Sequence, residues 1–270
     1  MPGAPAGDTV RPVSTTTVPL GTLLKDWRRR RRLSQLDLAL EAGVSARHVS
    51  FLETGRSKPS REMVLHLSDQ LDVPLRDRNR LLLAAGYAPA FEERPIDAPE
   101  MAPVREALDR VLTGHEPYPA VVVDRWWNLA AANRAIATFT AGVPEHLMQP
   151  PVNVLRVSLH PDGMASRIRN YGEWRAHLLD RLRRQVALTA DDRLTALYEE
   201  LSGYPGEIGE VHGPGGEIAV PLRFDAGGRE LAFFSTVATF GTAIDITLSE
   251  LAIEAFFPAD EATAAYLRGN

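Results

Sequence analysis

The sequence contains no cysteine among its 270 residues, which excludes both disulfide bonds and thiolate metal sites. It also lacks any apolar run long enough to cross a bilayer, and its first residues lack the basic start and apolar core of an export signal. These absences are compatible with a reducing compartment. We therefore expect a cytoplasmic protein that has no membrane partner.

Motifs of common catalytic sites are absent as well. The chain has no G-x-S-x-G nucleophile elbow, no phosphate-binding loop and no H-E-x-x-H motif, and its seven histidines are scattered. The stretch Gly213 to Gly216 follows no apolar strand and precedes no helix, which favours a plain loop over a phosphate cradle. We expect neither an enzyme nor a metal site.

The charge is unevenly distributed along the chain. The formal net charge is -5, yet residues 20–62 carry ten basic and five acidic side chains, which leaves +5 in this segment and -10 in the remainder. A basic region within an acidic protein is typical of a part that meets phosphate groups.

Two domains are expected from the pattern of helices, strands and linkers. Residues 1–19, rich in proline and threonine, are expected to form a disordered tail. A proline-rich linker over 89–104 separates a helical domain, 20–88, from a second domain, 105–270. In the first domain, hydrophobic spacing near 3.6 residues and serine caps predict five short helices, over 20–33, 35–42, 45–53, 60–71 and 74–85.

The second domain is expected to be α+β. A hairpin turn is predicted at Asp225 to Gly228, a loop at Gly203 to Gly216, and a helix cap at Asn133. Strands are predicted within 120–130, 218–224, 230–240 and 243–257. Helices are predicted over 104–112, after Asn133, over 152–159, 168–188 and 191–201, and after Pro258.

The segment from Ser34 to Gly55 has the spacing of a helix-turn-helix. Ala39 is small where two helices cross, Gly43 suits a left-handed turn, and Leu52 pins the following helix. The pattern resembles the phage-repressor family, the XRE or Cro-like regulators, and runs through all five predicted helices. The resemblance implies an all-α, lambda-repressor-like domain that binds a double-stranded DNA operator.

The resemblance also assigns roles to individual positions. Arg47 is the strongest candidate for reading a base, because arginine can donate two parallel hydrogen bonds to guanine. The base-reading positions are Ala46, Arg47, His48, Ser50 and Phe51. The phosphate-contacting positions are Gln35, Ser45, Arg56, Ser57 and Lys58. The run Arg28 to Arg32 cannot share one helix face, and we expect it to be mostly solvated.

Several segments of the second domain carry a further resemblance. Residues 123–133 are similar to the opening of PAS-like sensor domains. The segments 153–161, 170–174, 177–184 and 233–241 resemble the ligand-binding domain of MmyB-like regulators. The resemblance implies a PAS-like fold with an apolar pocket that takes a fatty-acid-like ligand in some relatives.

The helix predicted over 168–188 is the candidate wall of that pocket. Trp174, Leu178, Leu182 and Val186 form one arc of its helical wheel, with a polar margin beside them. A core helix with a polar edge is the alternative interpretation. The candidate pocket residues are Trp174, His177, Leu178, Arg181, Phe233, Phe234 and Phe240.

Together these features predict a homodimeric, sequence-specific transcription regulator that binds DNA and a small apolar ligand, with no other cofactor. Two alternatives stay open. One is a redox or small-molecule enzyme tethered to DNA, and the other is a regulator whose second domain is only a protein-interaction module.

Overall fold

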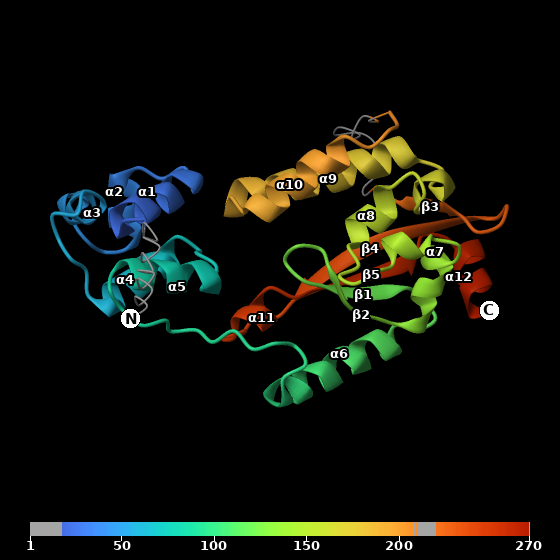
Figure 1. Cartoon of the computed structure of the whole chain (residues 1–270), viewed down its shortest axis with the longest axis horizontal. Coiled ribbons are helices and arrows are strands. Elements are labelled where there is room, and N and C mark those ends of the chain that lie inside the picture. The colour runs from blue at the N-terminus through green and yellow to red at the C-terminus, as the bar shows by residue number, and fades with distance from the viewer. Residues whose placement is uncertain (1–17, 208, 210–219, 270) are drawn as a thin grey trace, which may run out of the picture. The chain divides into compact units, whose positions relative to one another are not determined.

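The computed structural model describes residues 18–207, 209 and 220–269, in two compact units (Figure 1). The first unit ends at Ala90 and the second begins at Phe91. Nearly all of the expected tail, and most of the expected loop at 203–216, lie outside the described residues. None of the described helices combines the length and apolar character that a membrane span requires.

The first unit is all-helical, as the sequence predicts. Serine side chains accept backbone hydrogen bonds at the starts of three of its helices: Ser34, Ser45 and Ser60. Gly43 turns the chain between two helices at a φ of +64°, a conformation that suits glycine. The five helices are α1 (Leu20–Arg30), α2 (Gln35–Glu41), α3 (Ala46–Glu53), α4 (Arg61–Gln70) and α5 (Leu75–Ala84).

The core of this unit sets the orientation of α3. Val49 and Leu52 of α3 are fully buried with Leu38 of α2. On the other side, α1 crosses so closely that a Cβ added to Gly21 would lie 2.3 Å from the Glu53 carbonyl oxygen. Helix α3 therefore packs tightly on its inner side, while its outer side faces away from the core.

Two arginines of the basic run make structural hydrogen bonds, although Arg28 alone of the five is buried. Arg28 is buried and donates hydrogen bonds to both carboxylate oxygens of Glu53, at 2.6 and 2.9 Å. Arg31 donates to the carbonyl oxygens of Leu71 and Asp72, just beyond the end of α4. Because neighbouring helical residues diverge by about 100°, a run of five necessarily turns some side chains inward.

The second unit contains a five-stranded antiparallel sheet, which confirms the α+β expectation. Its strand order is β2-β1-β5-β4-β3. Gly227 and Gly228 lie in the predicted turn between β3 and β4, both at positive φ. The strands are β1 (Ala120–Val123), β2 (Leu129–Ala132), β3 (Leu222–Asp225), β4 (Glu230–Thr239) and β5 (Ala252–Pro258).

Helices cover both faces of this sheet (Figure 1). Leu108 and Leu112 of α6 pack on Val122 at one face, and a larger core with α8, α9 and α10 fills the other. The helices of the described part are α6 (Ala102–Gly114), α7 (Ala137–Thr140), α8 (Val154–Leu159), α9 (Tyr171–Thr189), α10 (Asp192–Ser202), α11 (Ile246–Ser249) and α12 (Glu261–Arg268). Four short 3-10 turns accompany them: η1 (Pro99–Met101), η2 (Arg134–Ile136), η3 (Glu145–Leu147) and η4 (Ala165–Arg167).

Two local expectations for this unit are wrong. The Asn133 side chain caps no helix; it accepts a hydrogen bond from the Ala120 amide and donates to the Leu112 and Tyr118 carbonyls. The predicted strand over 243–257 is interrupted by α11, whose first turn is capped by the Asp245 carboxylate. At Asn133, hydrogen bonds to distant backbone groups replace the predicted helix cap. At 246–249, a capped helical turn replaces part of the predicted strand.

Part of the segment predicted as a linker packs on the second unit. The Ile246 amide donates to the Glu92 carbonyl at 2.8 Å, and Arg94 forms an ion pair with Asp245 at 3.0 Å. Arg105 of α6 donates to two carbonyl oxygens of the same segment, those of Ile96 and Ala98.

Candidate nucleic-acid interface and ligand cavity

The outer side of α3 presents the residues predicted to read bases. Arg47 is exposed, and its guanidinium lies over the Phe51 ring at 5.0 Å from the ring centre. His48 and Ser50 are half-buried, and Ala46 packs partly against the core. Arg47 is therefore the basic side chain that this helix projects outward.

A buried ion pair connects the end of α3 to α1. The Glu53 side chain is 2% exposed and accepts hydrogen bonds from Arg28 and from the Gln35 amide, the latter at 2.8 Å. Burial opposes ionisation of Glu53, but these hydrogen bonds and the charges of Arg28 and Lys25 outweigh it and hold its pKa below the usual value. The Gln35 side chain, predicted to contact phosphate, is thus engaged with Glu53.

The other predicted phosphate contacts lie around the two ends of α3. The Ser45 hydroxyl caps the helix by accepting the His48 amide at 3.1 Å. After the helix, the amides of Arg56 and Ser57 both donate to the Phe51 carbonyl, which shapes the loop. Lys58 is exposed, with its ammonium 5.7 Å from the Tyr87 ring centre. The structure brings Arg47, Phe51 and Arg56 together, since both guanidinium groups lie over the same ring.

The second unit contains a partly open apolar cavity, with about 80 Å³ of interior space, between the inner face of its sheet and helices α7, α8 and α9. Phe139 forms part of the wall, and its ring meets three other phenylalanine rings edge-on at 5.1 to 5.3 Å. The apolar lining residues are Val121, Leu129, Ile136, Phe139, Met148, Val152, Val154, Leu155, Val157, Met164, Trp174, Leu178, Leu222 and Phe256.

Three polar side chains reach the same wall: Thr140, Ser158 and Glu254. The Ser158 hydroxyl accepts the Trp174 indole N–H at 3.1 Å. The Glu254 carboxylate is buried and accepts a hydrogen bond from Arg181 at 3.2 Å. The charged group on the cavity wall is therefore an acid that is already paired with a cation behind it.

Only two of the seven predicted pocket residues, Trp174 and Leu178, line this cavity. His177 stacks beside Trp174, and burial, followed by the charges of Arg181 and Arg184, lowers its pKa. Arg181 reaches the wall only through Glu254.

The three predicted phenylalanines lie elsewhere. Phe233 is buried in the core behind the wall, and Phe234 is 40% exposed on the opposite face of β4. Phe240 follows β4 and packs with the α6 cluster on the other side of the sheet. Successive strand residues point to opposite faces, so Phe233 and Phe234 cannot share one pocket.

The sequence did not predict most of the residues that line this cavity. Met148 and Val152 come from an irregular segment between η3 and α8, and Val157 comes from the short helix α8. A helical wheel finds no signal in such a segment, because irregular backbone has no period. The sequence signal for this part of the wall is the pair of apolar residues, Val152 and Val154, on either side of Asn153.

Comparison with known proteins agrees with this two-part architecture. Residues 24–77 match the helix-turn-helix family model. Residues 104–269 match the MmyB-like transcription regulator ligand binding domain. The chain is also similar to the uncharacterized HTH-type transcriptional regulator RghRB of Bacillus subtilis (strain 168), with 32% identity over 115 residues, which are 42% of this chain and 81% of that protein.

These matches define a helix-turn-helix DNA-binding transcription regulator with a ligand-binding domain. The chain belongs to the family of MmyB-like transcription regulators. Both resemblances read from the sequence are confirmed. The family comprises regulators rather than enzymes, which removes the DNA-tethered enzyme as an alternative.

Proposed function

We propose that this regulator binds a two-fold-related DNA operator as a homodimer and that a small apolar molecule in the second unit controls its binding. The apolar cavity is the observation that carries the ligand, because protein interiors are otherwise close-packed and an unfilled apolar cavity lowers stability. The exposed Arg47 on an anchored α3 carries the DNA contact.

For DNA, the proposal divides the side chains into two groups. Arg47 reads a guanine and Phe51 packs on a thymine methyl, with Ala46, His48 and Ser50 beside them. Arg56, Ser57 and Lys58 contact backbone phosphates, together with the amino-terminal ends of α2 and α3 at Gln35 and Ser45. This division supports sequence-specific binding rather than general attraction to DNA.

For the ligand, size and charge favour a compact molecule over a fatty acid. The cavity of about 80 Å³ is smaller than the engineered cavity of ~150 Å³ that accommodates benzene. In addition, the described lining residues include no cation that could pair with a fatty carboxylate, since Arg181 lies behind the wall and donates to Glu254. We infer a small apolar ligand that donates a hydrogen bond; a fatty-acid-like ligand would have to widen the cavity or extend out of its open side.

The ligand proposal is tested by filling the cavity. Leu178→Trp extends a wall residue that is 3% exposed, whereas Leu188→Trp alters an exposed position on the same helix, α9. Native mass spectrometry of the purified full chain should detect a small molecule with wild type and Leu188→Trp, but not with Leu178→Trp. Equal occupancy in all three proteins would place the ligand elsewhere.

The homodimer is tested separately by sedimentation of the full chain with and without operator DNA. We expect a mass of two chains on an operator whose half-sites are separated by about one helical turn of DNA. A single chain bound to a single half-site would exclude the dimer.

A further inference from the structure

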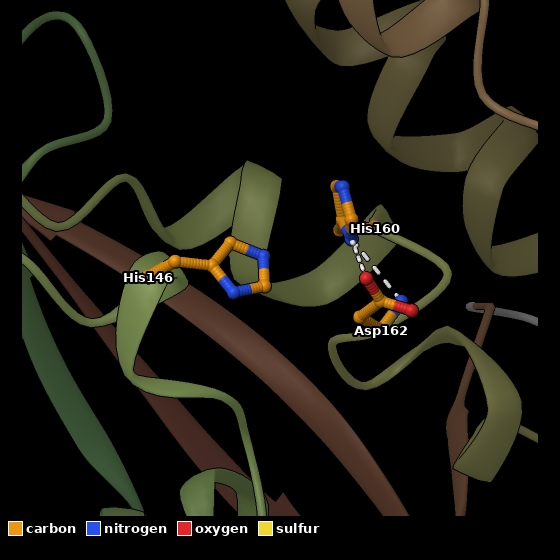
Figure 2. Close-up of side chains that lie close together, drawn as sticks. All are labelled: His146, His160 and Asp162. Atoms are coloured by element: carbon orange, nitrogen blue, oxygen red, sulfur yellow. Dashed lines mark hydrogen bonds and ion pairs between the residues drawn. The ribbon is translucent and has the colours of Figure 1, made fainter.

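Three potential ligands for a metal ion gather beside the cavity wall. His146 belongs to η3, while His160 and Asp162 belong to the loop that follows α8. Their nearest donor atoms all lie within 4.8 Å of one another. Figure 2 shows the His146 ring directed toward the other two side chains, which are already linked to each other.

The His160 ring is fixed by its neighbours. The Asp162 amide donates to its Nδ1 at 3.1 Å, and the Asp162 carboxylate lies 3.9 Å from the same nitrogen. The rings of Tyr204 and His146 meet it edge-on, at 5.1 and 5.8 Å between ring centres. His146 and Asp162 are exposed, so their side chains can adjust to a shared partner at small cost.

We propose that His146, His160 and Asp162 bind a divalent transition-metal ion of the zinc or nickel type. Two imidazoles and one carboxylate are ligands that such ions accept, and water completes the coordination. Neighbouring ligands of tetrahedral zinc lie about 3.3 Å apart, compared with 3.9 Å between His160 Nδ1 and the Asp162 carboxylate. Binding at this nitrogen replaces the hydrogen bond from the Asp162 amide.

The ion would join two segments of the cavity wall. His146 is two residues before Met148, and His160 is two residues after Ser158; both Met148 and Ser158 line the cavity. A metal bridge across these segments restricts their separation and slows ligand exchange. Ion binding does not depend on the ligand proposed above, whereas this effect on the cavity does.

The test is calorimetric titration of tag-free full-length protein with zinc chloride. Wild type should bind one ion at this site with a micromolar dissociation constant, and His146→Ala and Asp162→Ala should each weaken binding at least tenfold. His66→Ala, which alters an exposed histidine outside the cluster, should bind as wild type does. Unchanged affinity in both cluster variants would overturn the proposal.

Two further measurements separate a coordination site from a surface effect, and a third tests the effect on the cavity. Calcium chloride should bind at least a hundredfold more weakly than zinc, because Ca²⁺ prefers oxygen ligands; equal affinities would overturn the proposal.

Zinc should also raise the melting temperature of wild type but not of the variant His146→Ala/His160→Ala. In the zinc-loaded wild type, release of phenol, used as a small apolar probe that donates a hydrogen bond, should slow relative to the same double variant. If zinc binds but phenol release is unchanged, the metal site stands and its effect on the cavity is excluded.

Discussion

Two basic side chains of the first unit have similar charge but different surroundings. Arg47 projects from α3 and stacks on Phe51 of the same helix. Lys58 lies in the loop after α3, close to the Tyr87 ring. A helix can enter the major groove and reach base edges, whereas such a loop lies at the level of the phosphates.

Replacing each of them should therefore damage binding in a different way. Arg47→Ala should lose about 1–3 kcal/mol on the true operator and almost nothing on random DNA. Lys58→Ala should weaken binding to every sequence similarly and reduce the log-log salt slope by about 0.9. Titrations of both variants on operator and scrambled duplexes at several salt concentrations distinguish these outcomes. If Lys58→Ala alone abolished the operator preference, α3 would not be the recognition helix.

The buried pair behind α3 makes the first unit sensitive to acid. Since the pKa of Glu53 is lowered in the folded state, its ionisation stabilises the fold above its usual value of 4.5 and this contribution is lost as pH falls through the lower folded value. Glu53→Gln leaves Arg28 buried without a counter-charge, at a cost of about 3 kcal/mol near pH 7.

Hydrogen exchange of the α3 amides in the full chain measures this effect. The difference in protection between wild type and Glu53→Gln should be largest near pH 7 and should shrink below about pH 4. Glu41→Gln alters an exposed carboxylate at the end of α2 and serves as the control, with little expected change. A constant difference across the pH range would contradict the ionic role of Glu53.

At the scale of elements, the orientation of α3 depends on its close crossing with α1. The added Cβ at position 21 meets backbone atoms of Leu52 and Glu53, which cannot swing away as a side chain would. Gly21 lies in the first turn of α1, where other residues are equally compatible with the helix, so glycine here reflects the contact with α3. Helix packing, and not local propensity, requires this residue.

Gly21→Ala should therefore destabilise the first unit by about 1–3 kcal/mol, against the usual benefit of alanine in a helix. Gly114→Ala is the matched control: Gly114 ends α6, and its added Cβ would meet no atom within 4 Å among the described residues. The control should be neutral or stabilising by up to about 1 kcal/mol. Urea unfolding followed by circular dichroism, with operator affinity as the second readout, tests both variants.

At the scale of the whole molecule, the second unit begins at Phe91, before the predicted domain start at 105. The segment that carries Glu92 and Arg94 hydrogen-bonds with the first turn of α11, and Ile96 packs with the α6 cluster. Ordered contacts of this kind belong to a domain rather than to a linker.

A fragment of residues 91–270 should consequently be more stable than one of residues 105–270. Removing the segment deletes the ion pair to Asp245, exposes the apolar surface beneath Ile96 and leaves the Ile246 amide without its acceptor, at a combined cost of a few kcal/mol. Parallel thermal melts of the two fragments measure the difference. Equal melting temperatures would show that the segment contributes nothing to this fold.

The sequence by itself determined the features that local chemistry controls. Serine caps, glycine turns and a 3.6-residue period predicted the five helices of the first unit and the residue types displayed on α3. The Asp225 to Gly228 turn and the α+β character of the second domain were equally readable. Such signals are local because caps, turns and periodicity involve residues only a few positions apart.

Tertiary structure alone decided which distant surfaces meet. No local pattern pairs Arg28 with Glu53, directs Asn133 to Leu112, or brings His146 to His160. The cavity wall likewise combines strands with an irregular segment. The helical wheel of 168–188 therefore identified two of the wall residues, Trp174 and Leu178. Contacts of this kind depend on how whole elements pack, and the same local sequence is compatible with many packings until the complete chain selects one.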